Sequence, residues 1–283
     1  MNLVMSEMKR IRTSYGVIVS YAIHGNVTDT PPLVLVHGGF SDHWTNWEFI
    51  LHSLATQFTV YAIARRGRGE TDDTPIRRIE DEAEDVVELI ESIGEDVFLL
   101  GHSYGAHVAL LAASRLTAGK VRKLILYEPP AGGLMRGHRN ALEAYARGAD
   151  WHGLSYTFFR DVLHVPLEEL DALTESDLWL PIVADAEATA GDVRALSEYD
   201  FRPESFGSFG APVLLQAGSE SPRHLYATDA LAAVLPDARV ETLDGQAHEG
   251  MTTAPQQYFE SVAGFLKDGI EVRPEASYFF VGG

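Results

Sequence analysis

Residues 97–109, VFLLGHSYGAHVA, decide how this chain is understood. The run VFLLG predicts a buried strand, and AHVALLAASRL, which begins at residue 106, carries apolar residues at helical spacing. Between them Ser103 stands two residues after Gly101 and two before Gly105, the G-x-S-x-G pattern at a strand-to-helix turn. Such a turn is crowded, and glycine removes the Cβ atoms that would collide there. The pattern therefore predicts a serine nucleophile lifted above the edge of a sheet.

Strand-like and helix-like segments alternate along the chain from residue 33 onward. This alternation predicts an α/β fold, with a mostly parallel sheet flanked by helices on both faces. A hairpin around Tyr15 and Gly16 is expected at one edge of the sheet. With VFLLG and five further apolar runs it gives eight strands, the five being 32–38, 59–64, 121–128, 212–218 and 238–243.

The alternation breaks between the strand ending at Glu128 and the strand beginning at Pro212. Residues 131–206 contain several helix-like pieces and are too long for an idle loop. We expect them to form a helical cap, inserted after the sixth strand between the two parts of a core domain, residues 1–130 and 207–283. The last part ends in an apolar tail, SYFFV, which is expected to dock on its own body or on a second subunit, so a homodimer is possible.

Composition excludes several classes of function. The formal charge of −19 would repel nucleic acid and anionic membranes, which leaves a small molecule as the expected partner. The absence of cysteine excludes disulfides, thiolate metal sites and a cysteine nucleophile. The sequence has no signal-peptide-like start and no long apolar run, and we expect a cytoplasmic protein. Arg66-Gly67-Arg68-Gly69 lacks the spacing and lysine of a nucleotide loop, no metal motif is present, and no cofactor is expected.

A serine nucleophile needs a base and, for acyl transfer, donors for an oxyanion. The glycine-rich HGGF after the first parallel strand supplies Gly39 as the expected loop donor, with Phe40 lining the pocket. The N–H of Tyr104, at the head of the following helix, is the expected second donor. His248 is preferred as the base because it follows the last strand and comes after Ser103 in chain order. His37 and His102 are expected to hydrogen-bond the backbone instead.

On HGGF, GHSYG and the late histidine of GQAHEG, the chain resembles the α/β-hydrolases with a helical cap. The resemblance covers about residues 15–128 and 211–266. It implies that Ser103 attacks a carbonyl, that His248 moves the proton and that an acid orients His248.

The acid departs from the family's common pattern. Members usually place an aspartate after the strand that here reads PVLLQAG, but Glu220 and Ser221 stand there. A minority take the acid from the strand beside the nucleophile strand, which here ends in Glu128. We prefer Glu128, expecting the two prolines that follow to hold it extended at the rim, and keep Glu220 as the alternative.

Aromatic residues of the cap and of the oxyanion loop indicate an apolar pocket. The leading function is that of a serine esterase acting on a small hydrophobic ester, lactone or thioester through an acyl-enzyme. The same fold also serves carbon–carbon bond hydrolysis or perhydrolysis, and a protein that binds a small ligand without catalysis is a third reading. The expected substrate-binding residues are Phe40, Trp151, Phe159 and Trp179.

Overall fold

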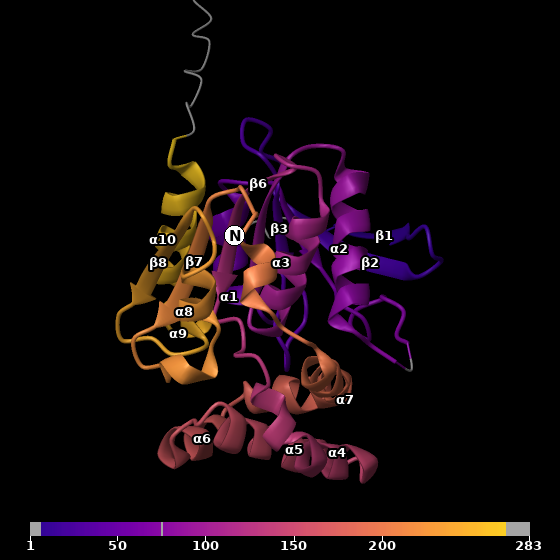
Figure 1. The fold of residues 1–283 in the computed structure, drawn as a ribbon. Coiled ribbons are helices and arrows are strands. Elements are labelled where there is room, and N and C mark those ends of the chain that lie inside the picture. Colours follow the sequence, from indigo (N-terminus) through magenta and orange to yellow (C-terminus); the bar gives the residue numbers. More distant parts are fainter. Residues whose placement is uncertain (1–6, 75, 270–283) are drawn as a thin grey trace, which may run out of the picture.

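The computed structural model describes residues 7–74 and 76–269, and its centre is one eight-stranded sheet (Figure 1). The strand order is β1-β2-β4-β3-β5-β6-β7-β8. β1 and β2 pair with each other antiparallel, β2 pairs antiparallel with β4, and all other pairs are parallel. The strands are β1 (Glu7–Arg12), β2 (Ile18–His24), β3 (Leu33–Val36), β4 (Val60–Ile63), β5 (Val97–His102), β6 (Val121–Tyr127), β7 (Val213–Gly218) and β8 (Ala238–Leu243). The eight-stranded α/β fold and its edge hairpin are therefore as expected.

Helices cover both faces of the sheet, and this divides the core into two layers. Alternate side chains of the central strands point to opposite faces, so Val34 packs in one layer and Leu35 in the other. One layer is shared with α2 (Ile79–Ile93), α3 (Tyr104–Arg115) and α8 (Thr228–Ala232). The other is shared with α1 (Glu48–Ala55), α9 (Gly250–Thr253) and α10 (Pro255–Lys267). This burial fixes the sheet and holds the carboxyl ends of its parallel strands in one row.

Between β6 and β7 the chain leaves the sheet and forms a group of helices, hereafter the inserted helices. They lie together beyond one end of the sheet, at the bottom of Figure 1. The longest, α7, lies closer to the sheet than α4 and α6 do (Figure 1). Their bounds are η1 (Leu134–Gly137), α4 (Arg139–Arg147), α5 (Trp151–Thr157), the π-helical η2 (Phe158–Val162), α6 (Leu167–Thr174), α7 (Trp179–Glu198) and η3 (Pro203–Phe206).

Two further sequence expectations concern the C-terminal tail and membrane-spanning segments. The SYFFV tail lies outside the described residues. Within residues 7–74 and 76–269, no helix combines the length and the apolar character that crossing a bilayer requires.

Candidate active site

Ser103 occupies the sharp turn between β5 and α3. Its φ is +53° and its ψ is −123°, a conformation that a non-glycine residue rarely adopts. The turn is crowded, as the sequence predicts: a Cβ at Gly105 would lie 2.3 Å from the carbonyl oxygen of His37, and one at Gly101 would lie 2.5 Å from that of Gly105. The flanking glycines thus let the start of α3 press against β3 and β5, and this packing holds Ser103 in its strained conformation.

Glu128 and His248 meet across the ends of β6 and β8. His248 Nδ1 lies 2.6 Å from Glu128 Oε2, and Glu128 Oε1 accepts a 2.7 Å hydrogen bond from the N–H of Gly218. Glu128 is fully buried. The expectation that it is held extended is wrong: its φ is +47°. This left-handed turn ends β6, and both carboxylate oxygens nevertheless find donors.

Glu220, the alternative acid, lies elsewhere. Its side chain is exposed and accepts a hydrogen bond from Ser219 Oγ at 3.0 Å. Its own N–H donates to the carbonyl oxygen of Gln246 at 2.9 Å, and Glu220 does not line the cavity of Ser103. Of the two glutamates, the structure brings only Glu128 to His248.

The charges around His248 favour its protonated form. Burial alone would lower the pKa of His248, but the hydrogen bond and charge of Glu128, together with the charge of Glu249, raise it. A base whose conjugate acid is stabilised in this way accepts a proton readily. Burial, with the nearby charge of Glu128, also raises the pKa of Glu249 to about 7. A second titratable carboxyl group therefore stands beside His248 on the cavity wall.

Of the N–H groups of Gly38, Gly39 and Phe40, which follow β3, only that of Gly39 has no hydrogen-bond partner among the described residues. The N–H of Gly38 donates to Asn46 Oδ1 at 2.8 Å, and the N–H of Phe40 donates to Thr189 Oγ1 at 2.7 Å. Among the described residues, no acceptor lies within hydrogen-bonding reach of the N–H of Gly39. Both Gly39 and Tyr104 line the same cavity as Ser103. The N–H of Tyr104 belongs to the first turn of α3, where backbone donors have no partner within the helix.

The cavity that Ser103 and His248 share is small, about 50 Å³, and mostly apolar. Phe40 and Phe159 line it, with ring centroids 5.4 Å apart. Trp151 and Trp179, which we expected there, do not: Trp179 packs behind Phe159, with centroids 6.1 Å apart. The remaining lining residues come from strand ends and from the inserted helices: His102, Pro130, Leu134, Met135, Phe158, Val162, Leu163, Thr189, Asp192, Val193, Leu196, Tyr226 and Glu249. Sequence reasoning missed most of these because they carry no local motif.

His37 and His102, the histidines beside the two glycine patterns, hydrogen-bond the backbone, as predicted. The ring of His37 contacts the carbonyl oxygen of Gly38 and accepts from the N–H of Arg65. His102 Nε2 lies 3.0 Å from the carbonyl oxygen of His248. One side-chain atom each of His102, His248 and Glu249 would fit around a metal ion, with these atoms within 4.8 Å of one another. Both ring nitrogens of His102 are already within hydrogen-bonding distance of other atoms, which makes the group a poor set of ligands.

Comparisons with known proteins found a matching family model, similar sequences and a similar structure. A sequence model of the alpha/beta hydrolase family matches residues 33–261. Epoxide hydrolase B of Mycobacterium tuberculosis is 32% identical over 110 residues, 37% of this chain and 31% of that protein. N-formylmaleamate deformylase of Pseudomonas putida is 35% identical over 104 residues, 36% of this chain and 38% of that protein. The matched stretch thus spans only about a third of each of these relatives. The crystal structure of an alpha/beta hydrolase from Sphaerobacter thermophilus superposes with a TM-score of 0.74 and 28% identity over 91% of this chain and 99% of that one.

Proposed function

Because the chain belongs to the alpha/beta hydrolase family, we propose that it is a serine hydrolase acting through an acyl-enzyme. One observation carries the proposal: Ser103 and His248 face one cavity, and buried Glu128 holds the opposite nitrogen of His248. The proposed substrate is a small hydrophobic ester, lactone or thioester, because the cavity is small and mostly apolar. In this proposal the inserted helices act as the cap of the site.

The proposed reaction has two halves. Ser103 Oγ attacks the substrate carbonyl while His248 Nε2 takes its proton, and Glu128 stabilises the imidazolium that forms. The N–H groups of Gly39 and Tyr104 donate to the oxyanion. His248 then gives its proton to the departing alcohol or thiol. In the second half water attacks the acyl-serine, with His248 again as base, and Ser103 is released.

The choice of an acyl substrate follows from the nucleophile. If Ser103 opened an epoxide it would form an ether, which water in the site has no ready means to cleave. An ester formed on Ser103 is cleaved by the same base and oxyanion donors that made it. Carbon–carbon bond hydrolysis and perhydrolysis use the same groups. Product analysis on ester and diketone substrates, with and without peroxide, separates these reactions.

The decisive experiment is reaction with a fluorophosphonate, which modifies serines activated by a base. We expect a single adduct on the peptide bearing Ser103, and its loss together with ester hydrolysis in Ser103→Ala. Ser114→Ala is the matched control, because Ser114 lies exposed on the same helix, α3. Full turnover by Ser103→Ala would refute the proposal. If no adduct forms and no ester is cleaved, a ligand-binding protein becomes the better description.

A further inference from the structure

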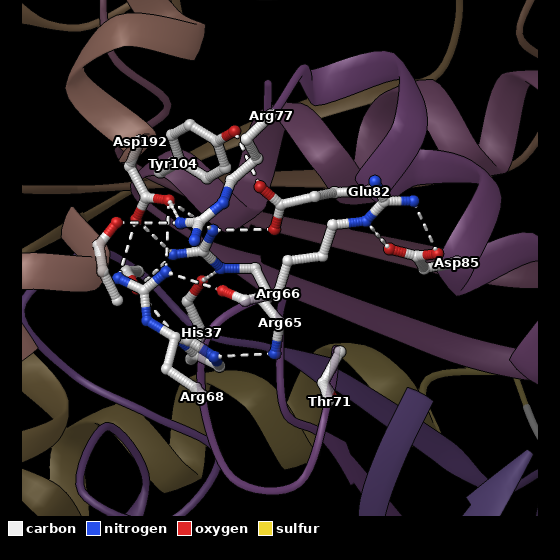
Figure 2. Close-up of polar contacts among 12 residues, drawn as sticks. His37, Arg65, Arg66, Arg68, Thr71, Arg77, Glu82, Asp85, Tyr104 and Asp192 are labelled. Carbon is white, nitrogen blue, oxygen red and sulfur yellow. Dashed lines mark hydrogen bonds and ion pairs between the residues drawn. The ribbon is translucent and has the colours of Figure 1, made fainter. Parts of the chain in front are cut away.

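Six charged side chains, five of them buried and that of Asp185 partly buried, meet behind the loop after β3 (Figure 2). Three guanidinium groups surround the carboxylate of Asp192 on α7: Arg77 at 2.7 Å, and Arg65 and Arg68 at 2.8 Å each. Glu82 of α2 pairs with Arg65 at 2.9 Å, and Asp185 of α7 pairs with Arg68 at 2.8 Å. We call these residues the arginine cluster. It joins the turn after β4 to the inserted helices.

The arginine cluster also forms hydrogen bonds with the loop that carries Gly39. Arg65 donates from Nε to the carbonyl oxygen of His37 at 2.9 Å and from Nη2 to that of Gly38 at 2.8 Å. The same Nη2 donates to Asp192. One guanidinium group therefore spans the loop and α7, so the position of Asp192 bears directly on the position of the Gly39 N–H.

Thr189 makes a second link between α7 and this loop. Its hydroxyl accepts the N–H of Phe40 at 2.7 Å and donates to Asp185 at 2.8 Å. Arg68 also donates to it at 3.0 Å. By occupying the N–H of Phe40, Thr189 fixes the peptide that follows Gly39. The orientation of this peptide helps to define where the Gly39 N–H points.

The arginine cluster also contacts Tyr104, whose N–H is the second proposed oxyanion donor. The hydroxyl of Tyr104 donates to Glu82 at 2.9 Å, and the Arg65 guanidinium lies over the Tyr104 ring, 4.4 Å from its centroid. In Figure 2 Arg65 lies between Tyr104 and His37, and it contacts both. One buried group of charges thus supports both residues proposed to bind the oxyanion.

Stability alone gives little reason to bury so many charges. Replacing a buried ion pair by apolar side chains often costs nothing or stabilises a protein, because desolvation offsets the attraction. Burial by itself would raise the pKa of Asp192, but Arg65, Arg68 and Arg77 outweigh it and hold that pKa well below its ordinary value. Asp192 therefore stays charged at any pH at which the protein works, and its contacts with the arginines persist.

We propose that Asp192 and Thr189 are positioning residues for the oxyanion donors, so that α7 takes part in setting the reaction rate as well as in covering the cavity. This inference rests on the proposed serine-hydrolase function. Neither residue transfers a proton. Each acts through the loop, Asp192 by way of Arg65 and Thr189 by way of the N–H of Phe40.

The test compares Asp192→Asn and Thr189→Val with Asp85→Asn. Asp85 forms an equally buried two-bond pair with Arg66, at 2.7 and 3.1 Å, beside the cluster but without contact to the loop (Figure 2). It therefore controls for the loss of a buried carboxylate. Each variant is assayed for kcat and KM on p-nitrophenyl butyrate, for inhibition by butylboronic acid, which forms a tetrahedral adduct on the serine, and for its urea unfolding midpoint.

We expect Asp192→Asn to lower kcat by about 10²-fold, in the range seen when one oxyanion donor is lost. Thr189→Val should lower kcat about tenfold, and Thr189→Ser, which keeps the hydroxyl, should recover most of that loss. KM should change little, while butylboronic acid binding weakens in parallel with kcat. Asp85→Asn should lower the urea midpoint and leave kcat within about twofold.

The positioning role is refuted if Asp192→Asn and Asp85→Asn lose the same share of kcat, or if Thr189→Val matches or exceeds the wild-type rate. If Asp192→Asn does not fold, Thr189→Val and Thr189→Ser decide the matter, since they leave every charge in place. Failure of the proposed function looks different. Ser103→Ala would then retain turnover, whereas failure of the positioning role alone leaves Ser103→Ala inactive and Thr189→Val fully active.

Discussion

The carboxyl edge of the sheet and the inserted helices bring side chains to one cavity by different means. At the sheet edge Phe40 and Ser103, which follow β3 and β5, line the cavity, and Glu128, which follows β6, contacts the lining residue His248 from behind. All three have positive φ, so each side chain is oriented by a sharp local turn. Phe159 and Thr189 of the inserted helices reach the cavity from helical backbone and are placed by distant contacts. Local turns therefore orient Ser103 and Glu128, two of the proposed catalytic residues, while tertiary packing shapes the space that a substrate would fill.

Replacing each candidate acid in turn by glutamine should give the largest effect, and it tests whether the turn at Glu128 positions the acid. In Glu128→Gln the amide nitrogen would face His248 Nδ1, which then has to accept and moves its hydrogen to Nε2. A histidine in that tautomer cannot take the proton of Ser103, so we expect kcat to fall by about 10⁴-fold. Glu220→Gln changes an exposed side chain and should stay within about twofold. Steady-state kinetics on one ester decide between them, and the reverse pattern would assign the acid to Glu220.

The sheet edge could be predicted from sequence because its signals are local. Each strand is an apolar run, and Ser103 and Gly39 lie in short glycine patterns just after two of them. The acid could only be narrowed to two glutamates, since its partner His248 lies 120 residues further along the chain. The prediction of an extended backbone at Glu128 is wrong. The two prolines restrict the chain after Glu128 but do not prevent a left-handed conformation at Glu128 itself.

The inserted helices were predictable as helices but not as a cavity wall. An apolar stripe shows which side chains avoid water, without showing whether they face the cavity or a neighbouring helix. Trp151 and Trp179 are expected to line the cavity because the cap is rich in aromatic residues, and the structure places neither there. Thr189 and Asp192 escaped notice because their importance depends on Phe40 and on arginines more than a hundred residues away.

Phe159→Ala tests whether the inserted helices determine which acyl groups the cavity accepts. Removing the ring enlarges the cavity, so kcat/KM for acetyl and butyryl esters should fall by about 10-fold or more while that for longer acyl chains falls less or rises. The measurement is kcat/KM over a series of p-nitrophenyl esters. Trp151→Phe serves as control, because Trp151 does not line the cavity and its loss should leave the chain-length preference unchanged. Equal losses for all chain lengths would show that Phe159 only stabilises the helices.

Glu249→Gln should produce the smallest change, and it appears in the pH profile. The charge of Glu249 helps to raise the pKa of His248, so its removal should lower that pKa. Since His248 must be neutral to act as base, the acid limb of kcat/KM should then move to lower pH, with a gain of less than about tenfold near pH 6. The profile is measured from pH 5 to 9 at constant ionic strength. An acid limb that moves to higher pH would contradict this account.

The arginine cluster also has a consequence for biosynthesis. Arg68 precedes Asp192 by 124 residues, a stretch that a ribosome takes roughly 6 to 25 s to add at about 5–20 residues per second. During that interval the nascent chain holds three arginines whose shared counterion has not yet been made, and their burial is unfavourable without it. We therefore expect these arginines to become buried only after α7 has been made, and the unfinished sheet to stay exposed until then.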